Sequence, residues 1–392
     1  MSEVDRLAAY RQAGVDLDAS NVASQMAGNY ARETWDNAGG SWKPLSPDAH
    51  LAASKVMPLD EIRSHPETSG VGGADGTGTK PEFYERLRNF YGLGFDLVAM
   101  AVDDIPTEGG QAVWMNNGLI VNNLNDDTLP HIDELFRGLR DAANQADIVL
   151  WTGETAVHGD RLTGPRGFAV DWIGDAFGLV HKERVITGTR VHEGDVLYGF
   201  AEPEGFRCNG ISLVRKSLRS AYGKSWELEQ FDGVSLGELV ATPSTIYSGL
   251  MRTLTGGYDI GREAVADIRG VAHISGGGMP EKIGRMLRAT GLGADIINPF
   301  KVPQIQKQVQ FVTDVKEGGE ERQMTDEELY TTWHGGQGYV VAAPESDHDV
   351  IVAAGQSHGI EVRPIGQVVK QPGIRVTSQA NIKTGTVLEF DV

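Results

Sequence analysis

A glycine-rich segment between residues 70 and 80 has the composition of a phosphate-binding loop. Five of the nine residues from Gly70 to Gly78 are glycine, and glycine lets a backbone approach a phosphate closely and direct N–H groups at it. Asp75 could bind a metal ion, and Lys80 could neutralise a phosphate. Thr79 precedes Lys80, so the segment is not a Walker A motif. A mobile loop without a ligand explains the glycines equally well. The candidate ATP- or phosphate-binding residues are Gly72, Gly73, Asp75, Gly76, Thr77, Gly78, Thr79 and Lys80.

Three further carboxylates could contribute to a magnesium site. Asp103 and Asp104 end an apolar stretch with helical spacing, and adjacent carboxylates suit hard cations such as the Mg²⁺ that accompanies ATP. Glu154 follows an expected strand where the chain runs into a turn. Taken alone, a solvated helix end explains the aspartates better, and a surface side chain explains Glu154 unless Asp75 lies nearby. The candidate metal ligands are Asp75, Asp104 and Glu154.

Two strand–glycine–helix turns in the second half of the chain could bind anions. Asn209 and Gly210 precede one expected helix, and Ser275 is followed by three glycines that open another. The N-terminus of a helix offers N–H groups and the positive end of the helix dipole. His273 could act there as an acid, a base or a donor to an anion, although a satisfied core histidine is the more frequent alternative. The candidates are Asn209 and His273 as catalytic residues, and Gly276, Gly277 and Gly278 as phosphate-binding residues.

The first half of the chain has the pattern of an α/β layer that would position these residues. Residues 92–105 are apolar with helical spacing, and Pro130 opens an amphipathic helix that ends at Ala146. Strands are expected over residues 111–123, 148–152 and 168–180. The order strand, helix, strand, strand suggests an α/β sheet of ferredoxin-like type.

The second half predicts another α/β domain. Helices are expected over residues 211–222, where Gly223 ends the helix, over 280–290 and over 347–356. Strands are expected over residues 195–201, 271–275, 338–343 and 365–369.

These patterns predict two domains with a boundary near residue 186. Residues 1–186 form the N-terminal domain and residues 187–392 the C-terminal α/β domain, so the fold class is α/β (α+β). Residues 1–66 are interpreted as a loose segment, with an amphipathic start over residues 6–11 and a polar stretch over 29–48.

The composition indicates a globular protein with an acidic surface. Of 392 residues, 40% are hydrophobic and 23% are charged, and the net charge is −19. Such a surface should repel nucleic acid and anionic membranes. The apolar runs are far shorter than the ~20 residues that span a bilayer, and residues 1–10 lack the apolar core of a signal peptide. A single cysteine excludes an internal disulfide and fits a reducing compartment such as the cytoplasm.

Seven short motifs also occur in order along the chain. They are Tyr10 with Ala13-Gly-Val-Asp16, Gly73-Ala-Asp-Gly-Thr-Gly-Thr-Lys80, Gly94-Phe-Asp-Leu-Val-Ala-Met-Ala-Val-Asp-Asp104, Gly153-Glu-Thr-Ala156, Cys208-Asn-Gly-Ile-Ser-Leu-Val-Arg-Lys216, Thr242-Pro-Ser-Thr-Ile-Tyr247 and Ala272-His-Ile-Ser-Gly-Gly-Gly278. In this order and spacing the chain resembles the aminoimidazole ribonucleotide synthetases, the cyclo-ligases of purine biosynthesis. Their superfamily includes selenophosphate synthetase and thiamine-monophosphate kinase.

The resemblance implies a two-domain homodimer that binds ATP and Mg²⁺ between its domains and takes a small nucleotide as substrate. It implies the conversion of formylglycinamidine ribonucleotide and ATP to aminoimidazole ribonucleotide, ADP and phosphate through an iminophosphate. By resemblance, the metal and ATP would be served by Asp75, Asp104 and Glu154. The substrate or the transferred phosphate would be served by Asn209, His273 and Gly276 to Gly278.

The chain departs from the family pattern near these motifs. A family Lys is replaced by Gly28, a family Asn by Asp103 and a family His by Arg207. A Phe-Asn pair is replaced by Trp333-His334, and a Glu-Met-Pro run is replaced by Val157-His158-Gly159. Two alternatives therefore stay open, another ATP-using member of the superfamily and a non-catalytic nucleotide-binding paralogue. A selenophosphate synthetase normally needs a reactive Cys near the glycine segment, and a hydrogenase-maturation protein uses a C-terminal Cys, whereas the cysteine here is Cys208.

Overall fold

The chain forms two units, which we describe from a computed structural model covering residues 17–44, 57–317 and 320–391. Unit 1 comprises the described residues up to Ile105 together with Ala112–Leu179, and unit 2 comprises Pro106–Gln111 and Val180 onward. The motif from Tyr10 to Asp16 and the expected amphipathic start lie outside the described residues. Within those residues, no helix combines the length and apolar content needed to cross a membrane.

Unit 1 is built on a four-stranded sheet with the strand order β1-β4-β2-β3. Its strands are β1 (Thr68–Gly76), β2 (Gln111–Val121), β3 (Val149–Val157) and β4 (Val170–His181). Its helices are α2 (Leu17–Arg32), α3 (Asp60–Ser64), α4 (Pro81–Leu87), α5 (Leu93–Val102) and α6 (Leu129–Ala146). The expected order strand, helix, strand, strand over residues 111–180 is observed as β2, α6, β3 and β4, and β2 and β3 pair in parallel.

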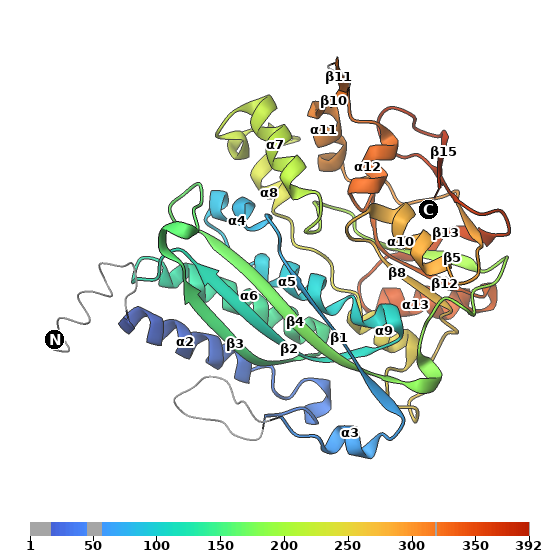
Figure 1. Ribbon diagram of the computed structural model, residues 1–392, viewed down its shortest axis with the longest axis horizontal. Coiled ribbons are helices and arrows are strands. Elements are labelled where there is room, and N and C mark those ends of the chain that lie inside the picture. Colours follow the sequence, from blue (N-terminus) through green and yellow to red (C-terminus); the bar gives the residue numbers. More distant parts are fainter. Residues whose placement is uncertain (1–16, 45–56, 318–319, 392) are drawn as a thin grey trace. The chain divides into compact units, whose positions relative to one another are not determined.

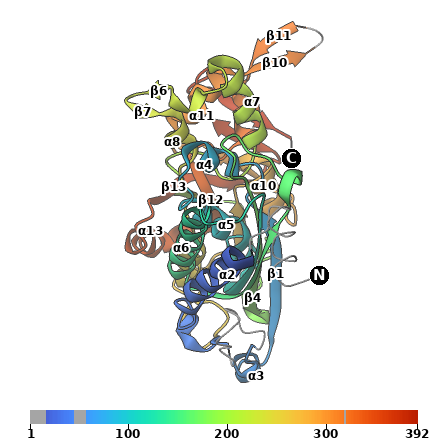
Figure 2. The same ribbon diagram turned by 90° about the vertical axis from the view of Figure 1, so that its left-hand side faces the viewer.

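Helices α2, α5 and α6 lie against one face of this sheet (Figures 1 and 2). All of α5 except Phe95 is buried, so this helix forms the centre of the unit. Helices α5 and α6 pack with their backbones close together, because a Cβ atom on Gly94 would overlap the backbone of Leu139 and one on Gly138 would overlap the carbonyl oxygen of Tyr91. Small residues at both positions therefore set the distance between the helices.

The opposite face of the sheet is partly open. Along β4, buried residues alternate with more exposed ones, and Ile173 is 53% exposed. Trp114 of β2 stacks on Phe177 of β4 at a centroid distance of 4.9 Å and packs edge-on against Trp151 of β3 at 4.7 Å. This face thus presents aromatic and aliphatic surface beside polar side chains.

Two expectations for unit 1 are wrong. The loose segment predicted for residues 1–66 contains the 16-residue helix α2, whose buried positions include Ala19, Ala23 and Ala31; a stripe of alanines gives only a weak hydrophobic pattern. The expected loop from Gly70 is strand β1 as far as Gly76. Glycine suits this strand because a Cβ atom on Gly72 would lie 3.0 Å from the Ala176 carbonyl oxygen of β4.

Unit 2 contains a seven-stranded sheet with the order β15-β14-β9-β13-β5-β12-β8. Its strands are β5 (Val196–Ala201), β8 (Gly270–His273), β9 (Gly293–Ile296), β12 (Gln337–Ala343), β13 (Val362–Val369), β14 (Ile374–Thr377) and β15 (Val387–Phe390). Two small hairpins are formed by β6 (Gln230–Phe231) with β7 (Val234–Ser235) and by β10 (Asp314–Glu317) with β11 (Glu320–Gln323). Its helices are α7 (Ile211–Tyr222), α8 (Leu236–Val240), α9 (Ser248–Thr255), α10 (Gly278–Leu287), α11 (Gln304–Val312), α12 (Asp326–Thr332) and α13 (His348–Ser357). The predicted α/β class with two domains is confirmed.

The pairing of β5, β12 and β8 determines where the functional turns of unit 2 lie. Strand β12 is antiparallel to both neighbours and pairs Gln337 with Ala201 and Tyr339 with His273. The ends of β5 and β8 and the start of β12 therefore share one edge of the sheet. Helix α10, expected from Pro280, begins two residues earlier at Gly278, and it ends at Leu287 rather than at Thr290.

The short segment Pro106–Gln111 belongs to unit 2 although it lies between two parts of unit 1 in the sequence. The Ile186 amide donates to the Glu108 carbonyl at 3.1 Å. Gly109 has φ +81°, and a Cβ atom there would overlap the carbonyl oxygen of Arg184. Only glycine fits this contact without strain.

Candidate functional site

The glycine segment of unit 1 presents some of its predicted ligands and buries others. The exposed residues of this segment include Gly72, Gly73, Gly78 and Thr79, and Gly76 is half-buried. Asp75 is exposed, and its Oδ1 atom accepts the Gly76 N–H at 2.7 Å. Thr77 is buried and its N–H donates to the Trp172 carbonyl oxygen of β4 at 3.1 Å. The exposed carboxylate of Asp75 remains a candidate ligand, whereas Thr77 continues the strand pairing.

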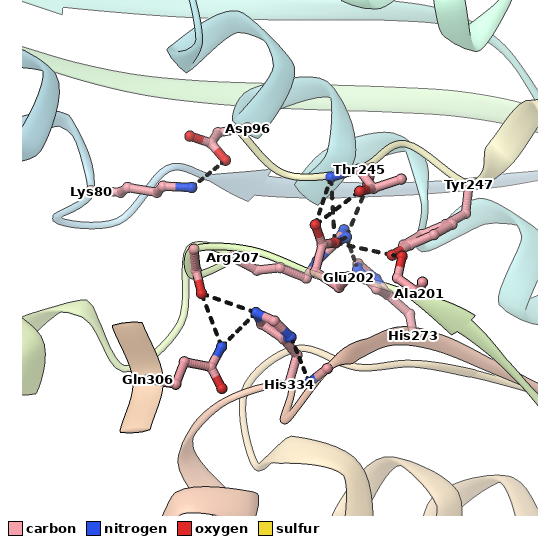
Figure 3. A network of polar contacts seen from close by, with 12 residues as sticks. Lys80, Asp96, Ala201, Glu202, Arg207, Thr245, Tyr247, His273, Gln306 and His334 are labelled. Atoms are coloured by element: carbon pink, nitrogen blue, oxygen red, sulfur yellow. Dashed lines mark hydrogen bonds and ion pairs between the residues drawn. The ribbon is translucent and has the colours of Figure 1, made fainter. Parts of the chain in front are cut away.

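Lys80 has a structural partner that its position beside the glycines did not predict. Its ammonium group lies 2.7 Å from Oδ1 of Asp96 on α5, and both side chains are completely buried (Figure 3). The Tyr84 hydroxyl donates to the other oxygen of the same carboxylate at 2.5 Å. Since a buried ammonium needs a compensating charge, Lys80 joins the glycine segment to α5, and its role in phosphate binding stays a prediction.

The candidate metal ligands lie on three different elements. Asp103 is completely buried at the end of α5, and the adjacent Asp104 is exposed. Glu154 is exposed on β3, which continues to Val157, so the expected turn at this position is wrong. Within the described residues, no three His, Cys, Asp or Glu side chains gather closely enough to hold a metal ion. Magnesium in ATP sites is usually held by one or two carboxylates together with phosphate oxygens.

A cavity of about 210 Å³ opens in unit 1 beside Glu154. Its apolar wall includes Phe136 and Leu139 of α6 and Leu150 of β3. Gly28 of α2 also lines it, at the position where the family pattern has a Lys. An apolar wall with a few polar groups at its rim is the usual form of a small-molecule site.

Two polar side chains around this cavity are held in defined orientations. The side-chain oxygen Oδ1 of Asn117 accepts from the Trp172 indole at 3.0 Å, so the side-chain nitrogen of Asn117 is turned toward Gly153. The Tyr30 hydroxyl donates to Asp133 at 2.7 Å. Burial and this hydrogen bond raise the pKa of Tyr30, so its hydroxyl stays protonated at neutral pH. Asn117 was missed in the sequence because an Asn within a strand has no distinctive pattern.

The predicted turns of unit 2 lie against each other at the shared sheet edge. Gly210 and Gly277 are the N-cap residues of α7 and α10, with φ of +70° and +86°, and neither helix has a side-chain cap. A Cβ atom on Gly276 would lie 3.2 Å from Oδ1 of Asn209. A Cβ atom on Gly210 would lie 2.6 Å from the indole nitrogen of Trp333. Two helix N-termini and the Asn209 side chain therefore meet in one place, as an anion site requires.

His273 lies at the end of β8 and is 3% exposed. Its Nε2 atom lies 2.9 Å from Nη2 of Arg207, which is itself 2% exposed. Arg207 Nη1 donates to Oε2 of Glu202 at 2.8 Å and to the Thr245 carbonyl oxygen at 2.9 Å. The guanidinium also lies over the ring of Tyr247, 5.4 Å from its centroid. Figure 3 shows this network around the end of β5.

The other side of the segment from Glu202 to Gly210 is held by His334. Its Nδ1 atom accepts the Gly336 N–H at 3.1 Å. Its Nε2 atom lies 2.6 Å from the Gln306 side-chain nitrogen and 3.3 Å from the Gly205 carbonyl oxygen. Arg207 and His334 are both positions where the chain departs from the family pattern, and both hold the segment that leads to Asn209.

Comparison with known proteins identifies the relatives of this chain. The family model for the N-terminal domain of AIR synthase related proteins matches residues 59–170, and the model for the C-terminal domain matches residues 192–379. The phosphoribosylformylglycinamidine cyclo-ligase of Clostridium novyi is 30% identical over 363 residues, covering 92% of this chain and 97% of the relative. The enzyme of that name from Gloeobacter violaceus is 34% identical over 308 residues, covering 78% and 83%. The chain belongs to the AIR synthase family. The resemblance seen in its motifs is confirmed.

The solved structure of E. coli HypE has the same fold as this member of the AIR synthase family. The TM-score is 0.58 at 18% identity, and the match covers 94% of this chain and 96% of that structure. The candidate residues thus stand on a fold that is also found in HypE. The polar network of Glu202, Thr245 and Tyr247 around Arg207 was not predicted, because its members are separated by tens of residues in the sequence.

Proposed function

We propose that this protein is an ATP-dependent cyclo-ligase that converts formylglycinamidine ribonucleotide to aminoimidazole ribonucleotide, with release of ADP and phosphate. One observation carries the proposal, namely that the likeness to curated cyclo-ligases extends over both units. The chain also keeps the acidic residues of unit 1 and the turns of unit 2 that the family motifs contain. We also assign the protein to the cytoplasm, because a chain with a single cysteine fits a reducing compartment.

The reaction needs positioning more than a strong nucleophile from the protein. The formyl amide oxygen attacks the γ-phosphorus of ATP, and ADP leaves with the electron pair of the broken P–O bond. The amidine nitrogen of the substrate then attacks the activated carbon. The C–O bond breaks, phosphate leaves and the nitrogen loses a proton, which closes the five-membered ring.

We assign nucleotide binding and dimer formation to the N-terminal domain, residues 1–186, and anion binding to the C-terminal domain, residues 187–392. The cavity beside Glu154 suits a purine base, because apolar side chains line one wall and Asn117 offers an amide. In the C-terminal domain, Asn209, His273 and the turn from Gly276 to Gly278 would bind the substrate or the transferred phosphate. Two helix N-termini without side-chain caps support this assignment.

Magnesium is the metal we propose for the ATP phosphates. Its candidate ligands are the exposed carboxylates of Asp75, Asp104 and Glu154. Bound Mg²⁺ would neutralise charge that develops on the phosphate oxygens during transfer. Asp103 is excluded from this set because its side chain is completely buried.

We also propose a homodimer formed through the open face of the unit 1 sheet. Ile173 is 53% exposed there, on the same face as the aromatic cluster of Trp114, Trp151 and Phe177, and exposed apolar surface of this kind marks interaction sites. Sedimentation at micromolar concentration should show a dimer, and Ile173→Lys should convert it to a monomer. A monomeric parent protein would contradict this part of the proposal.

The function is tested by incubating the full chain with formylglycinamidine ribonucleotide, ATP and Mg²⁺, and by measuring ADP and the ring product separately. Equimolar ADP and aminoimidazole ribonucleotide are expected. The departures at Arg207, Trp333 and His334 favour a second candidate, a phosphoryl-transfer enzyme of the same fold with another substrate. ADP release without ring formation would support that candidate, and ATP binding without ADP release would support a non-catalytic nucleotide-binding paralogue.

A further inference from the structure

The contact between Arg207 and His273 determines where the histidine carries its proton. Nη2 of Arg207 lies 2.9 Å from Nε2 of His273. A guanidinium group has only N–H donors and stays protonated in proteins. Nε2 must therefore be the acceptor, which makes the imidazole neutral with its proton on Nδ1.

The arginine cannot easily move away from this position. Glu202 and the Thr245 carbonyl oxygen both accept from Nη1, at 2.8 and 2.9 Å. Glu202 is fixed in turn by the Thr245 hydroxyl at 2.9 Å and by the Tyr247 hydroxyl at 3.0 Å. Arginine presents its donors in a planar fork, so these contacts also orient Nη2 toward His273. Arg207 and Glu202 are nearly completely buried, at 2% and 3% exposure.

The histidine ring is fixed as well. Its backbone pairs with Tyr339 in the sheet, and its ring lies 5.6 Å from the Tyr339 ring. A 180° rotation of the ring would exchange Nε2 with Cε1, place a carbon atom against the guanidinium and lose a buried hydrogen bond.

We propose that Arg207 is a positioning residue that holds His273 in the Nδ1–H tautomer, so that His273 serves as a neutral hydrogen-bond donor and not as a base through Nε2. The tautomer follows from contacts within unit 2, whereas its use in turnover rests on the proposed function. A fixed N–H donor stabilises an oxygen that gains negative charge without exchanging a proton with it. The His that the family pattern has in place of Arg207 could accept as well as donate, so it would not impose this tautomer.

The first experiment observes the tautomer in the unmodified chain. Nitrogen-15 spectra of histidine-labelled protein at neutral pH, with His273 assigned from the signals lost in His273→Asn, should show a protonated Nδ1 and an unprotonated Nε2. A protonated Nε2, or a ring protonated on both nitrogens, would overturn the proposal. This measurement does not depend on activity.

The second experiment compares two replacements of His273. An Asn side chain places its amide nitrogen near the position of Nδ1, and a Gln side chain reaches the position of Nε2. We expect His273→Asn to keep roughly tenfold more turnover than His273→Gln, because one lost donor in a site of this kind costs tenfold or more. Equal or reversed activities with folding intact would refute the donor role.

The third experiment removes the positioning group. Arg207→Met should give a mixture of His273 tautomers and lower kcat by roughly tenfold while the KM for ATP changes little. Arg207→Lys, which keeps a cationic donor, should restore part of the kcat. If Arg207→Met does not fold, the wild-type spectrum and the two His273 variants decide the question. The expected tautomer in a protein that makes no ring product would refute the cyclo-ligase function and leave the tautomer assignment standing.

Discussion

The two glycine-rich regions of the molecule use glycine for different reasons. In unit 1, the glycines from Gly70 to Gly76 lie on the extended strand β1, and positive φ begins only at Gly78. In unit 2, Gly277 and Gly278 have φ of +86° and +66° at the start of α10. Residue counting treats the two regions alike, but in unit 1 only Gly78 needs a backbone conformation that other residues rarely adopt, whereas in unit 2 two consecutive glycines need it.

The same difference appears in how closely each region is packed. No atom lies within 4 Å of a Cβ built on Gly73, whereas one built on Gly278 would overlap the carbonyl oxygen of Tyr330. In unit 1, Gly72 and Gly76 approach the backbone of β4, and the Lys80–Asp96 pair fixes the end of the segment. Unit 2 fixes its turn through glycines with positive φ. Substitutions in the two regions should separate these mechanisms.

The largest effect is expected for Lys80→Met. It would leave the Asp96 carboxylate buried without its ammonium partner, and breaking a buried pair in this way costs about 3–5 kcal/mol of unfolding free energy. Urea unfolding followed by circular dichroism measures the change. The double substitution Lys80→Met with Asp96→Leu should recover part of the stability. A stable Lys80→Met protein with weakened ATP binding would contradict this structural role and support the predicted role of Lys80 in phosphate binding.

A somewhat smaller loss is expected for Gly278→Ala. The left-handed conformation costs an L-residue about 1–2 kcal/mol, and the overlap with Tyr330 adds about 1–3 kcal/mol. The unfolding midpoint in urea should fall, and the ring-forming activity should fall with it because the turn is displaced. An unchanged midpoint would show that the contact with α12 is loose.

An effect on activity alone is expected for Asp75→Asn. The amide oxygen can still accept the Gly76 N–H, so the local turn and the unfolding free energy should be preserved. Loss of the carboxylate charge should lower ADP release about tenfold at limiting Mg²⁺, which corresponds to about 1.4 kcal/mol, and raise the Mg²⁺ concentration needed for half-maximal rate. Wild-type rates across a Mg²⁺ titration would remove Asp75 from the metal site.

The smallest effect is expected for Gly73→Ala. This position is exposed, has open space around its Cβ and does not have positive φ. Alanine restricts the unfolded chain more than glycine, so the unfolding free energy should stay constant or rise by about 0.5 kcal/mol. A loss comparable to that of Gly278→Ala would mean that the two regions do not differ as described.

The elements with strong local patterns could be predicted from the sequence. Helix α7 is found at its expected bounds, Ile211 to Tyr222, with Gly223 next at φ +83°, and α6 begins one residue before the expected Pro130. Short four-residue strands such as β9 and β14 were not predicted, because so few residues give no periodicity. Strand β1 was missed because glycines in a local sequence pattern indicate a loop. The pairing with β4, which makes them suitable for a strand, is not visible in that pattern.

The candidate site was predictable in its motifs but not in its connections. Asn209, His273 and the glycine turns were identified locally, and the structure brings them to one sheet edge. The partners of Lys80 and Arg207 were not identified, because Asp96 and His273 lie 16 and 66 residues away. The pairing of buried charges depends on tertiary packing, which local composition does not encode.

The segment Pro106–Gln111 makes unit 2 discontinuous, and this affects how the protein could be divided. A fragment beginning at Val180 would lack the Glu108 carbonyl that accepts the Ile186 amide and the Gly109 contact with Arg184. During synthesis on a ribosome, this piece of unit 2 emerges before most strands of unit 1. The two units therefore cannot be separated by a single cut in the sequence. A gene split between the codons for Leu179 and Val180 would separate unit 2 from its segment Pro106–Gln111.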